Sequence, residues 1–169
     1  MKHIRKATLS DLPAMLAIYA EARAYMIANG NPNQWGKIHS TQAAIENDIL
    51  SGKSYVCVNN GDIIAAFYFA VEEDPTYSTI DGTWLNDEPY GVIHRLARGK
   101  SGTGVGEFIL KWCLAQHPNI RIDTHENNTP MKNLLSKLGF VYCGIIWVRI
   151  SEERLAFGCA YQKDEAEVI

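Results

Sequence analysis

The stretch His94–Phe108, HRLARGKSGTGVGEF, joins an apolar segment to an amphipathic one through a loop rich in glycine. Four of the eight residues 99–106 are glycines. Glycine allows backbone N–H groups to approach a ligand closely, and the N-terminus of a following helix carries partial positive charge. We interpret the loop as a cradle for an anion, most simply a phosphate. A plain strand-to-helix turn, the alternative, would need fewer glycines.

Two common nucleotide-binding motifs do not fit this loop. A P-loop reads G-x-x-x-x-G-K-[ST], so the GKS at 99–101 would require glycine at position 94, where His94 stands. The dinucleotide fingerprint G-x-G-x-x-G follows the first strand of its βαβ unit. Here the glycines at 102, 104 and 106 have a different spacing, and the preceding strand comes late in the chain. The sequence therefore does not favour an ATPase, a kinase or a dinucleotide-dependent enzyme.

Composition indicates a globular protein. The 169 residues are 47% hydrophobic, with a net charge of -3, so we expect one domain over residues 1–169 and no nucleic-acid partner. The longest apolar run, 63–71, is too short to span a bilayer, and the first residues lack the apolar core of a signal peptide. We therefore expect a cytoplasmic protein without a membrane partner. No CxxC occurs, so we expect buried free thiols rather than disulfides or a zinc site at Cys57, Cys113, Cys143 and Cys159.

Periodicity and turn signals predict eleven elements in the order β-α-α-β-β-β-α-β-α-β-β. This order favours a mixed α/β fold. Residues 74–89 show no clear period and are expected to form an inserted loop. The predicted elements are a strand at 3–9, a helix at 10–30 capped by Ser10, a helix at 41–52, a hairpin at 54–73, a strand at 90–98, a helix at 105–117, a strand at 119–125, a helix at 128–139 and closing strands at 140–150 and 154–163.

Motifs after the glycine loop fall in a distinctive order. Asn128 lies 22 residues beyond Gly106, and LLSKLGF ends at Gly139-Phe140. With the loop, this pattern resembles the GNAT superfamily of acyl-CoA-dependent N-acetyltransferases, in which [Q/R]-x-x-G-x-[G/A] opens a helix and a later helix ends in Gly-Phe. The resemblance covers nearly the whole chain. It implies a mixed, mostly antiparallel central sheet with splayed parallel strands, flanked by helices.

The sequence departs from the family pattern at two positions. Ser101 stands where the family has Gln or Arg, so Lys100 or Arg98 would have to supply positive charge to a phosphate. Leu135 stands where the family often has the tyrosine that serves as general acid. Tyr142 and Cys143 are alternative acids for the leaving thiolate, and solvent is another source of the proton.

The resemblance implies acetyl-CoA as cosubstrate and no metal. Its pantetheine arm would pair with the strand at Leu96, Ala97 and Arg98, and Asn128 would reach the cofactor from the neighbouring strand. An amine would attack the thioester directly, and a backbone N–H near Leu96 would stabilise the oxyanion. The pyrophosphate would accept hydrogen bonds from the backbone of Ser101, Gly102, Thr103, Gly104, Val105 and Gly106.

His94 is the first candidate for the base that the attacking amine needs, because a histidine pKa lies near neutrality. Period-2 alternation places Val92, His94, Leu96 and Arg98 on one strand face, so His94 would lie next to the thioester. The alternative is that His94 has only a structural role, as a histidine hydrogen-bonded to a neighbour.

A second catalytic candidate is the pair Asp123 and His125. Alternation places Arg121, Asp123 and His125 on one face of their strand, and the opposite face is apolar. A polar face on a central strand indicates a cleft, although a salt-bridged strand end explains it equally. His94, Asp123 and His125 are also metal ligands by type, but no local spacing supports a metal site.

Two further features concern the acceptor substrate. Trp35, in the loop between the first two helices, is a candidate wall of the substrate pocket or a packing anchor. The segment 72–88 is rich in acids and holds Tyr77 and Trp84, which would suit a cationic amine, although a solvated surface loop is the simpler interpretation.

These observations favour acetyl transfer from acetyl-CoA to a primary amine of a small molecule or peptide. The alternatives are a non-catalytic acyl-CoA-binding or partner-binding module of the same fold, motivated by Leu135, and an unrelated phosphate-binding enzyme. The closing strands could pair with those of a second subunit, so a homodimer is possible.

Overall fold

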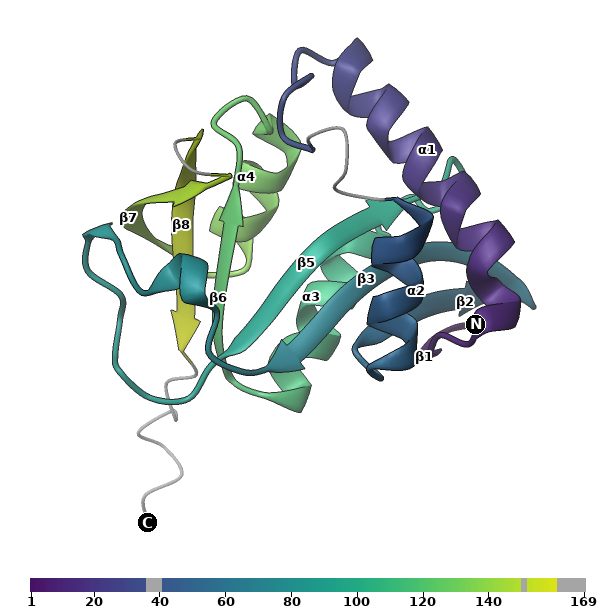
Figure 1. The fold of residues 1–169 in the computed structure, drawn as a ribbon, viewed down its shortest axis with the longest axis horizontal. Coiled ribbons are helices and arrows are strands. Elements are labelled where there is room, and N and C mark those ends of the chain that lie inside the picture. The colour runs from purple at the N-terminus through teal and green to yellow at the C-terminus, as the bar shows by residue number, and fades with distance from the viewer. Residues whose placement is uncertain (36–40, 150–151, 161–169) are drawn as a thin grey trace.

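The computed structural model describes residues 1–35, 41–149 and 152–160. Its centre is an eight-stranded sheet in the order β1-β2-β3-β5-β6-β8-β7-β4, with one parallel pair, β5 and β6 (Figure 1). The predicted mixed, mostly antiparallel sheet is therefore confirmed. Its strands are β1 (Lys2–Lys6), β2 (Ser54–Asn59), β3 (Asp62–Val71), β4 (Asp81–Gly82), β5 (Gly91–Arg98), β6 (Asn119–Thr124), β7 (Val141–Val148) and β8 (Glu152–Ala160).

Helices cover both faces of the sheet (Figure 1). One apolar core lies between the sheet and α1 and α2, and a second lies between the sheet and α3 and α4. No helix among the described residues is long and apolar enough to cross a bilayer. The four cysteines are free thiols; Cys57, Cys113 and Cys143 are buried as predicted, whereas Cys159 is half-buried. The helices are α1 (Leu12–Ala28), α2 (Gln42–Leu50), α3 (Val105–Gln116) and α4 (Thr129–Lys137).

The helix boundaries follow local capping chemistry. A short 3-10 turn, η1 (Leu9–Asp11), precedes α1, and a capping box of Thr8 and Asp11 begins it, rather than the predicted Ser10. Asn128 caps α4, because its side-chain oxygen accepts the N–H of Met131 at 3.2 Å. The expected strand ends at 150 and 161–163 lie outside the described residues.

The parallel strands β5 and β6 pair only at their beginnings. Gly91 lies opposite Ile120 and Val92 opposite Arg121, and no later pair follows. The strands then diverge toward their carboxyl ends, as Figure 1 shows. The splayed parallel strands are therefore confirmed, and the gap between them is where the cavities described below lie.

A β-bulge interrupts β5 at this divergence. Tyr68 lies opposite His94 and Ala66 opposite Ala97, so β5 advances three residues while β3 advances two. Arg95 takes the extra position with a φ of 51°. Positive φ is strained for a residue other than glycine, and bulges of this kind redirect side chains.

The bulge overturns the expected alternation along β5. Val92 and His94 face the side of the sheet covered by α2 and the segment 74–90, but Leu96 packs into the core beneath α3 and α4. The prediction that Val92, His94, Leu96 and Arg98 share one face is wrong, because one extra residue inverts every later side chain. An ion pair of 2.9 Å between Arg95 and Asp48 of α2 holds the bulge in place.

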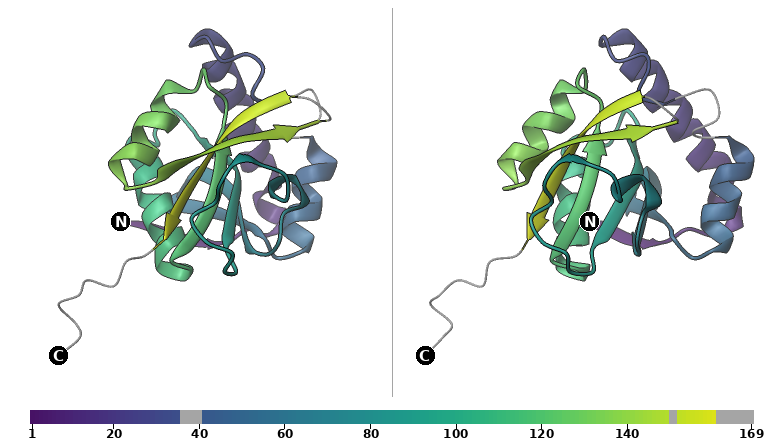
Figure 2. Two further views of the ribbon diagram at one scale, coloured as in Figure 1. Left: turned by 90° about the vertical axis from the view of Figure 1, so that its left-hand side faces the viewer. Right: turned by 60° about the vertical axis from the view of Figure 1, so that its left-hand side comes forward.

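The segment 74–89 has more structure than the expected loop. It forms a 3-10 turn, η2 (Pro75–Tyr77), and the strand β4, which pairs with β7. Gly82 and Gly144 meet so closely that a Cβ on Gly82 would lie 2.1 Å from the Cys143 carbonyl oxygen. In Figure 2 the segment comes forward beside β7 and β8, and it packs there in a third apolar cluster.

Candidate active site

Two cavities meet between β5 and β6. The larger, of about 840 Å³, lies between α1, the end of β5, the glycine loop and the start of α4. The smaller, of about 250 Å³, lies between β5, β6, η2 and the residues after α1. Four residues line both cavities and so mark their junction: Met26, Leu96, Asn128 and Met131. A long ligand in the larger cavity can therefore present its end to a second ligand in the smaller one.

The glycine loop borders the larger cavity with unused hydrogen-bond donors. Within the described residues, no acceptor is found for the backbone N–H groups of Thr103, Gly104, Gly106 and Glu107. Gly104 caps α3 with a φ of 74°, and nothing lies within 4 Å of the place its Cβ would occupy. Free N–H groups at a helix N-terminus are suited to bind an anion.

Two of the ten residues expected to hold the cofactor do not line the cavity. Ser101 is exposed on the outer turn. Gly102 is buried, and a Cβ there would lie 2.9 Å from the Ile64 carbonyl oxygen, so this glycine lets the loop pack against β3. The cavity does contain the expected Leu96, Ala97, Arg98, Thr103, Gly104, Val105, Gly106 and Asn128.

Positive charge reaches this cavity from Arg98 and Lys100, which both line it. The Arg98 guanidinium lies 5.7 Å from the centre of the Tyr25 ring, a cation–π contact, and the Lys100 N–H donates to Glu21 at 3.2 Å. Arg98 and Lys100 are the two residues predicted to supply positive charge to a phosphate, because Ser101 replaces the Gln or Arg of the family pattern.

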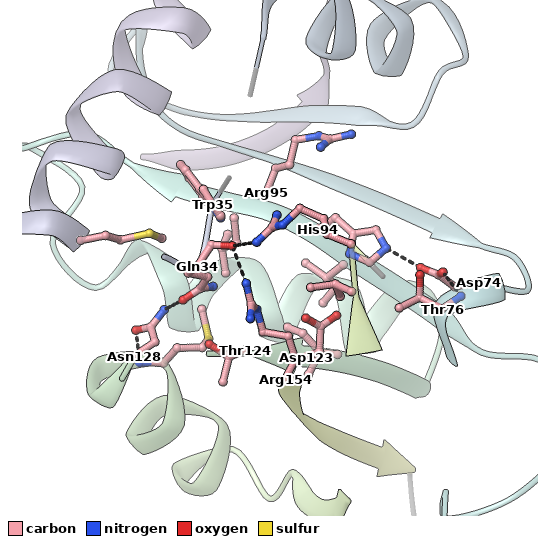
Figure 3. A pocket seen from close by; sticks show the side chains of 17 residues that line it. Gln34, Trp35, Asp74, Thr76, His94, Arg95, Asp123, Thr124, Asn128 and Arg154 are labelled. Carbon is pink, nitrogen blue, oxygen red and sulfur yellow. Dashed lines mark hydrogen bonds and ion pairs between the residues drawn. The ribbon is translucent and has the colours of Figure 1, made fainter. Parts of the chain in front are cut away.

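His94 stands in the smaller cavity, hydrogen-bonded to an acid from the inserted segment (Figure 3). Its Nε2 lies 2.7 Å from Asp74 Oδ2. Burial lowers the histidine pKa, but the bond to Asp74 and the charges of Asp123 and Asp74 raise it more, so the net pKa lies above its usual value. Asp74 is itself fixed, because its Oδ1 accepts the Thr76 N–H at 2.9 Å.

Asp123 lines the same cavity and accepts the hydroxyl of Tyr77 at 2.6 Å. Tyr77 is 1% exposed, and burial together with the charge of Asp123 raises its pKa far above the usual value. The tyrosine thus stays protonated and donates to Asp123. His94 and Asp123, predicted from separate strands, do come together.

Solved structures of known proteins share the fold that carries these cavities. A GNAT-family acetyltransferase from Streptococcus agalactiae superposes with a TM-score of 0.88 at 28% identity over 96% of both chains. The resemblance to the GNAT superfamily is confirmed. A GNAT-family acetyltransferase from Listeria monocytogenes shares the fold, with a TM-score of 0.71 at 16% identity over 93% of both chains.

Sequence comparison gives one curated relative of interest, and no protein-family model matches the chain. Streptothricin acetyltransferase from Escherichia coli is 33% identical over 99 residues, which are 55% of this chain. The match spans 57% of the relative's own length.

His125 does not join the other two catalytic candidates. It follows the end of β6, does not line either cavity, and its Nδ1 accepts the N–H of Asn127 at 3.0 Å. Burial and the charge of Arg154 lower its pKa. Among the described residues, no three acidic, histidine or cysteine side chains gather as a metal site would require.

The positions considered for the general acid also lie elsewhere. Leu135 is fully buried in the core beneath α4, and its neighbour Leu134 lines the larger cavity instead. Tyr142 is 54% exposed and packs on Phe157, and the Cys143 thiol donates to the Val141 carbonyl. Neither Tyr142 nor Cys143 lines a cavity, so the GNAT fold here offers no acid at these places.

Trp35 lies at a cavity and is also packed in the core, and its part in a substrate pocket stays a prediction. It lines the smaller cavity, and it is only 5% exposed, packed edge-on against Tyr19 with 5.9 Å between ring centres. It is therefore a rigid wall.

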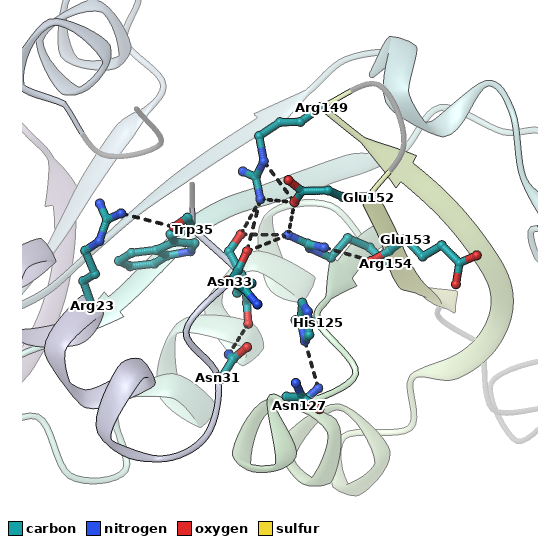
Figure 4. A network of polar contacts seen from close by, with 11 residues as sticks. Arg23, Asn31, Asn33, Trp35, His125, Asn127, Arg149, Glu152, Glu153 and Arg154 are labelled. Carbon is teal, nitrogen blue, oxygen red and sulfur yellow. Dashed lines mark hydrogen bonds and ion pairs between the residues drawn. The ribbon is translucent and has the colours of Figure 1, made fainter. Parts of the chain in front are cut away.

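A basic pair from the far end of the sheet holds the segment before Trp35, and sequence reasoning missed it (Figure 4). Arg149 and Arg154 each donate through Nη2 to the Gln34 carbonyl at 2.9 Å, and both also reach the Asn33 carbonyl. Glu152 accepts from both guanidinium groups. This cluster fixes the smaller cavity's wall from the β7–β8 hairpin.

Thr124 carries a hydroxyl without a partner. The residue is fully buried, lines the smaller cavity, and its Oγ1 makes no hydrogen bond within the described structure. A buried hydroxyl left unpaired is destabilising, so its position beside the junction is more readily explained by a ligand than by folding.

Proposed function

We propose that the protein transfers an acetyl group from acetyl-CoA to a primary amine of a small molecule or peptide. The observation that carries this proposal is the junction at Leu96, where the cavity bordered by the glycine loop meets the cavity that contains His94. The phosphates would bind the free N–H groups of the loop, and the thioester would lie at the junction. The printed names of the relatives, a GNAT-family acetyltransferase and a streptothricin acetyltransferase, support the same reaction class.

In this proposal His94 is the base. Burial raises the pKa of Asp74, but its hydrogen bonds to His94 and Thr76 help to lower it, and the net pKa lies below the usual value, so Asp74 is ionised. An ionised carboxylate only accepts, so Nε2 carries the hydrogen directed at Asp74, and Nδ1 of the neutral ring keeps a free lone pair. That lone pair would take a proton from the incoming ammonium group.

The neutral amine then attacks the thioester carbonyl carbon. The C–N bond forms, the C–S bond breaks, and CoA leaves as the thiolate, with the second amine proton passing to solvent or to the thiolate. Holding both substrates at the junction removes most of the entropic barrier to their encounter. A backbone N–H near Leu96, at the bulge, would stabilise the oxyanion.

The smaller cavity offers two carboxylates to the amine. Asp74 and Asp123 line it beside the ring of Trp35 and the guanidinium groups of Arg95, Arg149 and Arg154, so the incoming ammonium group would be placed against the two carboxylates. We propose that His94 and Asp123 act at this site, without a role for His125.

The decisive experiment is an acetyl-CoA assay with a panel of amines and detection of the free thiol. The panel contains amino acids, polyamines, peptides with free N-termini and streptothricin, the last because of the curated relative's name. Steady thiol release with any member, lost in His94→Ala, supports the proposal. CoA binding without turnover would favour the non-catalytic module, which Leu135 motivated. Absence of CoA binding would overturn both.

A further inference from the structure

An amide chain bridges the two cavities at their junction. Asn128 Nδ2 donates to Gln34 Oε1 at 2.8 Å, and Asn31 Nδ2 donates to the same oxygen at 2.7 Å (Figure 3 shows the Gln34–Asn128 link). The bridge connects the start of α4 to the segment after α1. Gln34 lines the smaller cavity, Asn31 the larger one, and Asn128 both.

The orientation of every amide in this chain follows from one backbone contact. The N–H of Met131 can only donate, so Asn128 must present its oxygen there and its NH₂ group to Gln34. Gln34 must then present its oxygen, and Asn31 must in turn present its NH₂ group. The Asn31 oxygen is therefore fixed away from the bridge.

That oxygen has no hydrogen-bond partner within the described structure. Asn31 is 4% exposed, and the residue lines the larger cavity. Buried amide oxygens are nearly always paired, because leaving one unpaired destabilises the fold. The oxygen is thus an acceptor that a hydrogen-bond donor of a ligand would satisfy.

We propose that Asn31 Oδ1 is a binding site for an amide N–H of the pantetheine arm of CoA. This inference rests on the proposed function. Asn31 lies two hydrogen bonds from Asn128 at the junction, whereas the glycine loop that would hold the phosphates lines the larger cavity alone. The pantetheine arm, which connects phosphate to thioester, has two secondary amides, and their N–H groups are the donors that such an oxygen needs.

The test compares two ligands by isothermal calorimetry: CoA, and 3′-phospho-ADP, which has the nucleotide and pyrophosphate but no pantetheine arm. Asn31→Leu keeps the size of the side chain and removes the acceptor. We expect it to weaken CoA binding about tenfold, as expected for loss of one buried hydrogen bond, and to leave 3′-phospho-ADP binding unchanged. Asn47→Leu, at an exposed asparagine outside both cavities, should change neither.

A second pair of variants tests the bridge should Asn31→Leu fail to fold. Gln34→Met removes the oxygen that orients Asn31, so CoA binding should weaken, whereas Gln34→Glu retains an oxygen and should weaken CoA binding less than Gln34→Met does. Unchanged CoA binding in Asn31→Leu, or an equal loss for both ligands, would overturn the inference. Wild-type protein that binds no CoA would instead overturn the proposed function, and this inference with it.

Discussion

Replacement of Thr124 by valine should stabilise the protein and impair its activity. The two side chains have nearly the same shape, so the change exchanges a hydroxyl for a methyl group without opening a cavity. Thr124 is fully buried and its hydroxyl is unpaired, so the wild-type protein bears a desolvation penalty of about 1–3 kcal/mol that valine removes. In a chain of this size each kcal/mol raises Tm by about 2–4 °C.

Urea denaturation and thermal melting of the ligand-free protein measure this gain. Thr41→Val is the matched control, because the Thr41 hydroxyl is paired: it accepts the Ala44 N–H at 3.3 Å and caps α2. Loss of such a cap costs about 0.5–2 kcal/mol, so the two substitutions should change stability in opposite directions. If Thr124→Val lowers the free energy of unfolding as Thr41→Val does, the hydroxyl has a partner in solution and the reasoning is refuted.

The remaining predictions concern ligand binding and pH. Gly104→Glu should abolish CoA binding by filling the anion cradle, whereas Gly104→Ala bears the same positive-φ strain and should retain it; equal CoA affinities of the two variants, by calorimetry, would contradict the cradle. His94→Ala should lower kcat far more than CoA affinity, with a smaller loss at high pH where more of the amine is neutral, and steady-state kinetics at several pH values checks this. In wild-type protein kcat/KM should fall as pH drops through the raised pKa of His94. Asp74→Asn should shift this acid limb to lower pH, because the hydrogen bond and charge of Asp74 no longer raise the histidine pKa and only the charge of Asp123 still does. An unmoved limb would remove His94 as the base. Arg154→Lys should lower the free energy of unfolding by about 2 kcal/mol and raise KM for the amine several-fold. The cause is loss of the hydrogen bonds from the buried guanidinium group to the Asn33 and Gln34 carbonyls. An unchanged amine KM would show that Arg154 is not needed to hold the wall of the smaller cavity.

Much of the fold could be predicted because its signals are local. Glycines at 99–106 mark a strand-to-helix turn, and Asn128 with Pro130 marks the start of α4. Period-2 alternation correctly placed Ile120 and Ile122 on the core face of β6, whereas Thr124, expected on the same face, is buried but lines the smaller cavity.

The site was less predictable because its contacts join distant segments. The bulge at Arg95 is not marked by a glycine in the sequence. The strained residue is instead held by an ion pair to Asp48, which lies 47 residues away. Asp74 and Tyr77 lay in a segment without period, and only the fold brings them against His94 and Asp123. The acid-rich composition of residues 72–88 was the one available signal.

The five residues 31–35 have a consequence for how the binding of one substrate affects the binding of the other. Asn31 belongs to the larger cavity, Gln34 and Trp35 to the smaller one, and the arginines of the β7–β8 hairpin hold the carbonyls between them. A ligand that orders this segment from one side reduces the entropy that the other must lose, and such coupling is reciprocal. We therefore expect cooperative binding, in which CoA and the amine each raise the affinity of the protein for the other.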